Sequence, residues 1–180
     1  MKNKLLLGLI FFSAMSVFSQ KWQYSAGLQG NWVDGKKYTG YDLNLIFAPK
    51  YTIKEFDSEN SIYAEIQPAI GVGFRNWHEN QGTGKDVYPS RISYSVPIVF
   101  GYNYGINATE NSMSTFGFYA AAGYGMNNVI SSDPSFDAIQ GIVLQAGLYL
   151  PTAPIGRFGF SYTIGNSDKK TYSVVFMLTF

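Results

Sequence analysis

Large apolar or aromatic side chains occupy every second position through most of this chain, and that alternation restricts its fold more than any other feature. The last ten residues, TYSVVFMLTF, place Tyr172, Val174, Phe176, Leu178 and Phe180 on one face and smaller or more polar residues on the other. Successive side chains of a β-strand point to opposite faces, whereas a helical face repeats every 3.6 residues. The pattern therefore predicts strands and no amphipathic helix of useful length.

Eight runs of this kind follow one another, and segments rich in turn-forming residues separate them. No linker indicates a second domain, so we expect one all-β domain, an eight-stranded antiparallel up-and-down barrel. The runs cover 22–32, 41–53, 62–75, 91–104, 116–127, 142–150, 157–164 and 171–180.

Two kinds of eight-stranded barrel compete, because alternation does not say which face is inside. A lipocalin-type barrel turns its apolar face inward around a ligand, and an outer-membrane barrel turns that face toward lipid. The apolar face holds well over twenty large side chains, too many for an eight-stranded interior that side chains only just fill. The other face carries many glycines, which suit a narrow lumen. Volume therefore favours the membrane barrel.

The charges inside the runs favour the same solution, because all of them lie on the polar face. A Lys or Arg that faces lipid at mid-membrane costs about 2–4 kcal/mol, so their absence from the apolar face fits a lipid boundary. The charged residues in question are Asp42, Lys50, Glu65, Arg75, Arg91 and Arg157.

Tyr and Trp residues of the apolar face gather near the predicted strand ends. Such amphipathic rings prefer the height at which hydrocarbon gives way to headgroups. The sequence therefore predicts an aromatic girdle, formed by Trp22, Trp32, Tyr41, Tyr51, Tyr94, Tyr102, Tyr104, Tyr124, Tyr162 and Tyr172.

The N-terminal segment MKNKLLLGLIFFSAMSVFSQ has two lysines, an apolar run and then small residues. This order predicts a secretory signal peptide over 1–19 and a mature barrel over 20–180. A single spanning helix is the alternative, but the apolar run falls short of the ~20 residues that a span needs. The chain has no cysteine, which excludes a lipid-modified cysteine anchor and disulfides.

The overall composition is unusual for a soluble enzyme. Charged residues make up 14% of the chain, against ~25% in ordinary soluble domains. There are 13 Lys and Arg against 12 Asp and Glu, so no basic excess indicates a nucleic-acid partner.

The C-terminal strand with its terminal aromatic, together with the length and strand number, resembles the small eight-stranded outer-membrane barrels that include OmpX and the membrane part of OmpA. The segments SYSVPIVFGYNYG (93–105) and FGFYAAAGYGM (116–126) are similar to middle strands of the outer-membrane β-barrel family common in Bacteroidetes. The resemblance implies an integral protein of the bacterial outer membrane, in contact with outer-membrane lipid and lipopolysaccharide. It also implies that the barrel-assembly machinery reads the last strand, and that other outer-membrane proteins are candidate partners.

The same topology predicts which segments face which side. With a periplasmic N-terminus, an even number of strands returns Phe180 to the periplasm. Long loops are usually outside and short turns inside, so 105–114 is long for a periplasmic turn. The expected outer loops are 34–40, 76–90, 128–140 and 165–170, and the expected turns are 54–60, 105–114 and 151–156.

The inward charges predict two clusters inside the lumen. If the second and third runs form a hairpin, Lys50 lies opposite Glu65, while Asp42 comes close to Arg75 and Arg91. An unpaired buried charge is expensive, so we expect these groups to pair. The simple interpretation is an internal polar plug that stiffens the barrel, and the alternative is a gated proton or ion path.

Two prolines interrupt neighbouring runs. Pro68 and Pro97 each remove a ladder hydrogen bond from a sheet without a free edge. The sequence therefore predicts a bulge or a local break at this seam.

The sequence gives little support for a catalytic or metal site. The single histidine, His78, has Glu79 beside it and Ser90 and Ser93 beyond it, and these residues could form a hydrolytic triad by geometry alone. The close His-x-Ser arrangement of outer-membrane deacylases is absent, since Asn80 holds that position. No ligand-spaced cluster indicates a metal. We therefore expect no catalytic residue, no cofactor and no metal.

The sequence leaves three functional readings in order of preference. The first is a non-enzymatic structural or interaction protein that presents surface loops or forms part of a larger outer-membrane assembly. The second is passage of small apolar solutes, as in OmpW-like barrels. The third is a lipid-modifying enzyme that uses His78.

Overall fold

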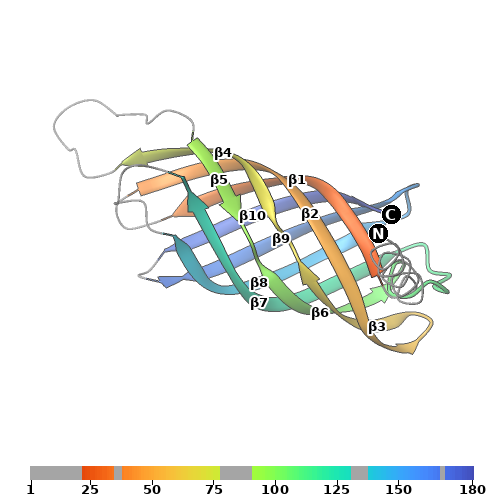
Figure 1. The fold of residues 1–180 in the computed structure, drawn as a ribbon. Coiled ribbons are helices and arrows are strands. Elements are labelled where there is room, and N and C mark those ends of the chain that lie inside the picture. Colours follow the sequence, from red (N-terminus) through yellow and green to blue (C-terminus); the bar gives the residue numbers. More distant parts are fainter. Residues whose placement is uncertain (1–21, 35–37, 78–90, 131–137, 167–168) are drawn as a thin grey trace, which may run out of the picture.

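The chain forms one closed antiparallel barrel (Figure 1). The computed structural model describes residues 22–34, 38–77, 91–130, 138–166 and 169–180, and for Tyr38 and residues 75–77 it describes the backbone alone. The predicted signal peptide, His78, Glu79 and Ser90 lie outside the described residues. No helix in the described ranges has the length and apolarity needed to cross a membrane.

The barrel closes because the first strand pairs with both the second and the last, so the ring has no free edge. Two of the eight spanning segments are each divided into two strands, which explains why ten strands build an eight-membered ring. The strands are β1 (Trp22–Asp34), β2 (Tyr38–Asp57), β3 (Asn60–Ile66), β4 (Ala69–Trp77), β5 (Arg91–Ser95), β6 (Ile98–Gly105), β7 (Gly117–Val129), β8 (Ile139–Leu150), β9 (Ile155–Gly165) and β10 (Lys170–Thr179). The predicted fold class is confirmed.

The divisions fall at the two prolines, so the predicted break is present. β3 gives way to β4 around Pro68, and β5 gives way to β6 around Pro97. Each proline carbonyl still accepts a backbone hydrogen bond, from Phe47 N to Pro68 (3.0 Å) and from Gln67 N to Pro97 (2.9 Å). Backbone pairing along the two divided segments, β3 with β4 and β5 with β6, is thus interrupted only where a proline lacks its N–H.

The two ends of the barrel differ. One end, which we call the turn end, carries the hairpin between β2 and β3, the turn between β6 and β7, and the C-terminus (Figure 1). At the other end, the loop end, β1, β4, β7 and β9 finish and β2, β5, β8 and β10 begin. An even number of spanning segments brings the start of β1 and the end of β10 to the same end.

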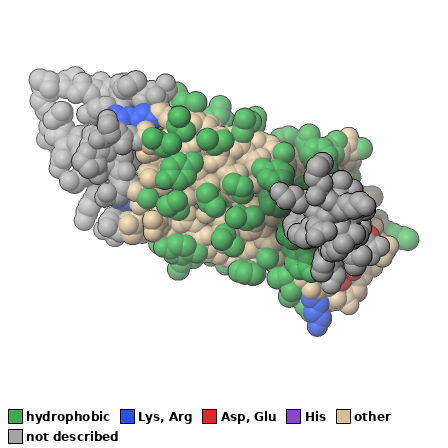
Figure 2. Space-filling model, in the orientation of Figure 1, with side chains coloured by type: hydrophobic (Ala, Val, Ile, Leu, Met, Phe, Trp, Pro, Cys, Tyr) green, Lys and Arg blue, Asp and Glu red, His purple; other side chains and the backbone are tan. Residues whose placement is uncertain are grey.

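The apolar face of the strands is on the outside, as the volume argument requires. Leu45 is 66% exposed, Phe100 61% and Ile70 60%. Figure 2 shows hydrophobic side chains spread over the visible face of the barrel between its two ends. The inward residues alternate with them and are buried, among them Gln29, Asn44, Gln67, Asn103 and Gln145.

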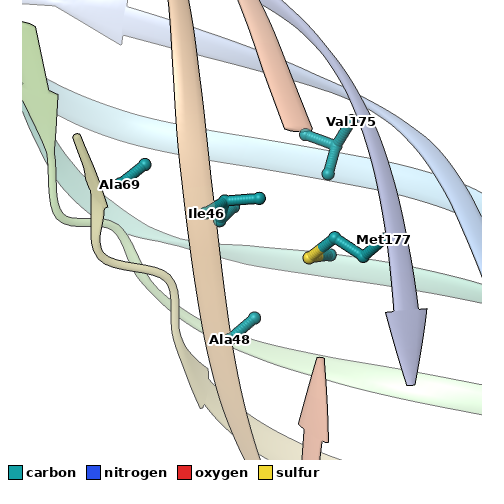
Figure 3. Packing of buried hydrophobic residues seen from close by; sticks show 5 residues of the cluster. All are labelled: Ile46, Ala48, Ala69, Val175 and Met177. Carbon is teal, nitrogen blue, oxygen red and sulfur yellow. The ribbon is translucent and has the colours of Figure 1, made fainter. Parts of the chain in front are cut away.

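The lumen also has an apolar part. Ile46, Ala48, Ala69, Val175 and Met177 form a buried cluster inside the barrel (Figure 3). These residues come from β2, β4 and β10, and their side chains lie toward one another across the interior. Side chains therefore fill this part of the lumen.

A charge placed on the outward face should separate lipid contact from exposure to water. We expect Leu45→Arg to lower the free energy of unfolding in lipid vesicles by about 2–4 kcal/mol, the cost of a cation at mid-membrane. Urea titration in vesicles measures this change. Glu55→Arg, which places the same side chain at the exposed hairpin tip of the turn end, is the control and should cost little. Equal effects of the two changes would contradict a lipid-facing surface.

Candidate functional site: a filled lumen

A buried ion pair crosses the lumen. Arg157 Nη1 of β9 lies 2.5 Å from Glu65 Oε1 of β3, and both side chains are at most 1% exposed. β3 and β9 are not neighbours in the ring, so the pair connects opposite walls. Gln67 Nε2 donates to Glu65 Oε2 (2.9 Å) and exchanges two hydrogen bonds with Gln145 of β8 (3.0 and 2.7 Å). The carboxylate therefore has partners on both oxygens.

Lys50 lies opposite Glu65 in the β2–β3 register, on the same inward face. Its ammonium nevertheless does not take Glu65 as its hydrogen-bond acceptor. Lys50 Nζ donates to Asn107 O (3.2 Å) and lies 3.5 Å from Tyr149 Oη. It also sits 5.4 Å from the ring centre of Tyr63 and 5.3 Å from that of Tyr149, within the range of a cation–π contact. The ion pair expected between Lys50 and Glu65 is thus replaced by one between Arg157 and Glu65.

Three inward tyrosines surround these charges. Tyr63, Tyr119 and Tyr149 are at most 3% exposed and form one buried cluster. The Arg157 guanidinium lies 4.0 Å from the ring centre of Tyr119, and Tyr149 Oη donates to Asn103 Oδ1 (3.2 Å). Nε and Nη2 of Arg157 have no hydrogen-bond partner among the described residues, so the Tyr119 ring is the main neighbour on that side.

Glycines make room for these rings. A Cβ at Gly101 would lie 2.5 Å from Cζ of Tyr63, and a Cβ at Gly159 would collide with the hydroxyl of Tyr119. Both glycines face inward: Gly101 of β6 lies directly opposite Tyr63 of the neighbouring β3, and Gly159 is on β9, two strands from Tyr119 of β7. The inward glycines therefore provide the volume that these large side chains occupy.

The long turn between β6 and β7 closes the turn end of the barrel. Asn107, Ala108 and Thr109 are at most 6% exposed. Ser61 Oγ donates to Ala108 O (2.6 Å), and Thr109 Oγ1 donates to Ser58 O (2.5 Å). Together with the Lys50 bond to Asn107, these contacts hold the turn against the lumen. They explain why this connection is longer than a simple hairpin turn needs to be.

Glu59 fastens the same turn from the outside. Its carboxylate accepts hydrogen bonds from Ser112 Oγ (2.8 Å), Ser114 Oγ (2.6 Å) and Met113 N (3.1 Å). The hydroxyls of Ser114 and Ser112, followed by the Met113 amide, favour the charged form and lower the pKa of Glu59 below its usual value of 4.5. The hairpin between β2 and β3 thus holds the next turn by charge-assisted hydrogen bonds.

The loop-end half of the lumen holds packed polar side chains alongside the buried Val33, Val129 and Ile139. Asp42 is 4% exposed and accepts from Asn127 Nδ2 (3.4 Å), and Ser93 Oγ donates to Asn44 Oδ1 (2.6 Å). A cavity of about 20 Å³ lies among Gln29, Asn127 and their neighbours, which is room for roughly one water molecule. Of the predicted second cluster, Asp42 is buried, Arg91 is half-buried at the start of β5, and the side chain of Arg75 lies outside the described residues.

The predicted girdle residues all lie on the outward face, and several are paired across strands. Ring centres are 5.1 Å apart for Trp22 and Tyr51, and 5.0 Å apart for Tyr162 and Tyr172. Tyr124 departs from the expected height, because it is in the middle of β7, opposite Ile98 and Ile142. The predicted outward residues are Trp22, Trp32, Tyr41, Tyr51, Tyr94, Tyr102, Tyr104, Tyr124, Tyr162 and Tyr172.

The last strand completes the ring. Tyr172, Val174, Phe176 and Leu178 of β10 face outward, and each lies opposite a residue of β1. Phe180 follows the strand, and its N–H donates to Tyr24 O (2.8 Å). The terminal aromatic is therefore still part of the closing ladder.

Of the residues considered for a hydrolytic triad, Ser93 is the one that lies within the described ranges. No group of three His, Cys, Asp or Glu residues there is arranged to hold a metal ion. Ser93 is fully buried, with its hydroxyl bonded to Asn44, which leaves it no access to a substrate.

The comparison with known structures identifies the architecture. No family model and no curated protein matches the chain. One similar solved structure is that of Ail, the attachment invasion locus protein of Yersinia pestis, in complex with the heparin analogue sucrose octasulfate. It superposes with a TM-score of 0.58 at 15% identity, over 89% of this chain and 98% of that one. Neisserial surface protein A superposes with a TM-score of 0.52 at 14% identity, over 88% of this chain and 95% of that one. The chain has the fold of the small eight-stranded outer-membrane β-barrels.

The ion pair across the lumen allows a double-mutant cycle. We expect Arg157→Met to lower the free energy of unfolding by about 3–5 kcal/mol, because it leaves the Glu65 carboxylate buried and unpaired. Glu65→Gln together with Arg157→Met should recover part of this loss, because neither charge of the pair then remains, while Lys50 keeps its hydrogen bond to Asn107 and its contacts with the tyrosine rings. Urea titrations of the two single variants and the double variant measure the coupling. Additive losses would contradict an energetic coupling between the two residues.

The hydrogen bonds by which Glu59 holds the turn between β6 and β7 should depend on pH. The pKa of Glu59 is lowered in the folded chain. Its contribution to the stability of the turn is therefore present above the ordinary glutamate pKa of 4.5 and is lost as pH falls through the folded value. We expect hydrogen exchange of the Met113 amide to accelerate over that range. In Glu59→Gln the exchange should show no such pH step after correction for the intrinsic rate, because the amide that replaces the carboxylate does not titrate. An identical pH profile in both proteins would contradict the conclusion that the Glu59 carboxylate holds the turn.

Proposed function

We propose that this chain is a non-enzymatic, non-conducting integral protein of a bacterial outer membrane, with a structural or interaction role. The fold and the apolar outer face support the membrane location, and the predicted signal peptide supplies the route of export. In this proposal the turn end is periplasmic and the loop end faces outside. The girdles of Trp and Tyr then lie at the two membrane boundaries.

The filled lumen is the observation that carries the proposal. The Glu65–Arg157 ion pair, the three tyrosines and the buried turn around Ala108 occupy the lumen toward the turn end. Passage of a solute would require these groups to separate, and leaving either member of a buried ion pair unpaired costs about 3–5 kcal/mol. This supports the interpretation of the inward charges as a plug and weighs against solute passage.

An interaction role then falls to the surfaces outside the lumen. Loops on a rigid scaffold are where binding residues usually lie, and in this proposal the connections between the strands at the loop end face outside. Membership in a larger outer-membrane assembly is the other form of the same role. In both cases the barrel acts as an anchor.

Conductance tests the proposal directly. We expect the purified barrel in planar bilayers to show no conductance above the bare bilayer, and liposomes that contain it to take up no small solutes. Tyr119→Ala combined with Tyr149→Ala and Arg157→Ala removes the bulk of the plug and serves as the positive control for insertion, because it should conduct. Steady conductance or uptake by the unchanged barrel would overturn the proposal.

The mass of the native complex, extracted in mild detergent from its own outer membrane, separates the two forms of the role. A fixed stoichiometric assembly would make the chain a subunit. A single barrel of its own mass would assign the interaction to the loop end. Recovery of the chain in a fraction other than the outer membrane would contradict the location.

A further inference from the structure

Lys50 brings a second positive charge into the turn-end half of the lumen, where one buried carboxylate already serves another cation. Its residue is 2% exposed. The carboxylate opposite it in the register, Glu65, holds Arg157 on one oxygen and Gln67 on the other. Among the buried residues that the structure describes in this half, two cations therefore face one carboxylate, and one positive charge is left over.

The contacts of Lys50 do not balance that charge. Its ammonium donates to the backbone oxygen of Asn107 and lies over the rings of Tyr63 and Tyr149. A carbonyl and an aromatic ring turn partial negative charge toward the ammonium, but neither carries a net charge. A buried ion is tolerated where it is paired, so the surplus charge calls for a counter-ion.

The unpartnered polar atoms around Lys50 are mostly donors. The amide nitrogens Nδ2 of Asn103 and Asn107 are buried and have no acceptor among the described residues. Oδ1 of Asn103 accepts from the Tyr149 hydroxyl, and this bond sets the orientation of the amide. One unpartnered acceptor, Oε1 of Gln23, is on the residue of β1 opposite Lys50. An amide oxygen is neutral, so it leaves the surplus charge in place.

The donors gather at the hydroxyl end of Tyr149, and their present contacts are long. Lys50 Nζ lies 3.5 Å from Tyr149 Oη and 3.2 Å from Asn107 O, and Tyr149 Oη lies 3.2 Å from Asn103 Oδ1. Hydrogen bonds usually measure about 2.5–3.0 Å from a hydroxyl donor and about 2.7–3.2 Å from a nitrogen donor. Glu65, by contrast, holds its two partners at 2.5 and 2.9 Å. The groups around Tyr149 Oη are thus less well satisfied than those around the ion pair.

The loop-end half of the lumen has a different set of unpartnered atoms. Asn31 has both amide atoms without a partner among the described residues, and so do Oδ1 of Asn127 and Oγ1 of Thr171. All three residues line the cavity of about 20 Å³. Donors mixed with acceptors suit a water molecule, which can both donate and accept. Donors beside a surplus ammonium suit an anion instead.

We propose that the turn-end half of the lumen binds one small monovalent anion, such as chloride, at the hydroxyl end of Tyr149. Lys50 Nζ and the Nδ2 atoms of Asn103 and Asn107 donate to it, and the anion neutralises Lys50 as Glu65 neutralises Arg157. The turn from Asn107 to Thr109 is buried over this end, so the enclosed site favours a single small ion over an organic anion. This goes beyond the proposed plug, because it names a ligand that the plug requires and does not depend on the cellular location of the chain.

The chloride dependence of stability tests the site. Each protein is refolded into phosphatidylcholine vesicles over roughly two decades of chloride concentration, with gluconate keeping the ionic strength constant, and is then titrated with urea. A ligand that binds the folded state alone stabilises it by mass action. We expect the unfolding equilibrium constant of the wild type to fall about tenfold for each tenfold rise in chloride above the dissociation constant.

Two variants of Lys50 and its neighbour on the hairpin locate the effect. Lys50→Met removes the ammonium and keeps a flexible side chain of similar length, so its stability should not respond to chloride. Lys54→Met, on the exposed part of the same strand, is the matched control and should respond as the wild type does.

Asn103→Asp provides a second test that does not depend on the folding of Lys50→Met. The new carboxylate supplies the missing negative charge beside Tyr149 Oη, so this variant should fold without chloride and gain no stability from it. A response of Asn103→Asp equal to that of the wild type would contradict the site.

The wild type gives the decisive outcome. Stability that is the same at every chloride concentration would overturn the inference, because Lys50 would then be buried without an anion. An equal response of the wild type and Lys50→Met would also overturn it, because chloride would then act elsewhere on the barrel.

Discussion

The rest of the structure depends on closure of the hydrogen-bond ladder. In hydrocarbon no water can satisfy an unpaired backbone N–H or C=O, so a sheet can cross a membrane only as a ring without edges. Here β1 meets β10 through ten residue pairs, from Ser25 with Thr179 to Asp34 with Lys170. The bond from Phe180 to Tyr24 extends the ladder by one more residue. Even the seam at Pro68 and Pro97 keeps the carbonyls of both prolines bonded, so the interruption does not open the ring.

Closure at eight strands makes the lumen narrow, and the narrow lumen explains the side chains inside it. A ring of this size has space for side chains and little else. Charges that face inward must then find partners across the lumen, as Arg157 of β9 does with Glu65 of β3. The three tyrosines need more volume than the alternation alone would provide, and glycines such as Gly101 and Gly159 supply it on strands one or two places away in the ring. Charge pairing and packing thus follow from one geometric restriction.

The sequence predicted the parts of this structure that depend on neighbouring strands. The period of two reveals the strands, and the register of a hairpin follows from its turn, so the position of Lys50 opposite Glu65 could be foreseen. The partner of Glu65 could not, because Arg157 reaches it across the barrel and no local pattern relates β9 to β3. The contacts of the buried turn around Ala108 could not be predicted for a different reason: the turn follows β6, a neighbour of β3, and its bonds to Ser58 and Ser61 depend on how its backbone folds over the end of the barrel. Contacts between strands that are not neighbours in the ring require the curvature of the sheet, which the pattern of residues does not contain.

The structural role of a glycine in this barrel depends on whether it lies on the inward or the outward face of the wall. On the inward face it accommodates a ring from a nearby strand, as Gly101 does for Tyr63, and replacing it would force that ring to move. On the outward face, at Gly30, it leaves a hollow in a surface that Leu28, Trp32 and their neighbours otherwise cover. Because residues of a strand alternate between the two faces, shifting a glycine by one position changes it from a packing device into a surface feature. A small barrel can therefore adjust its plug and its lipid contacts independently, with residues that are adjacent in sequence but face opposite sides of the same wall.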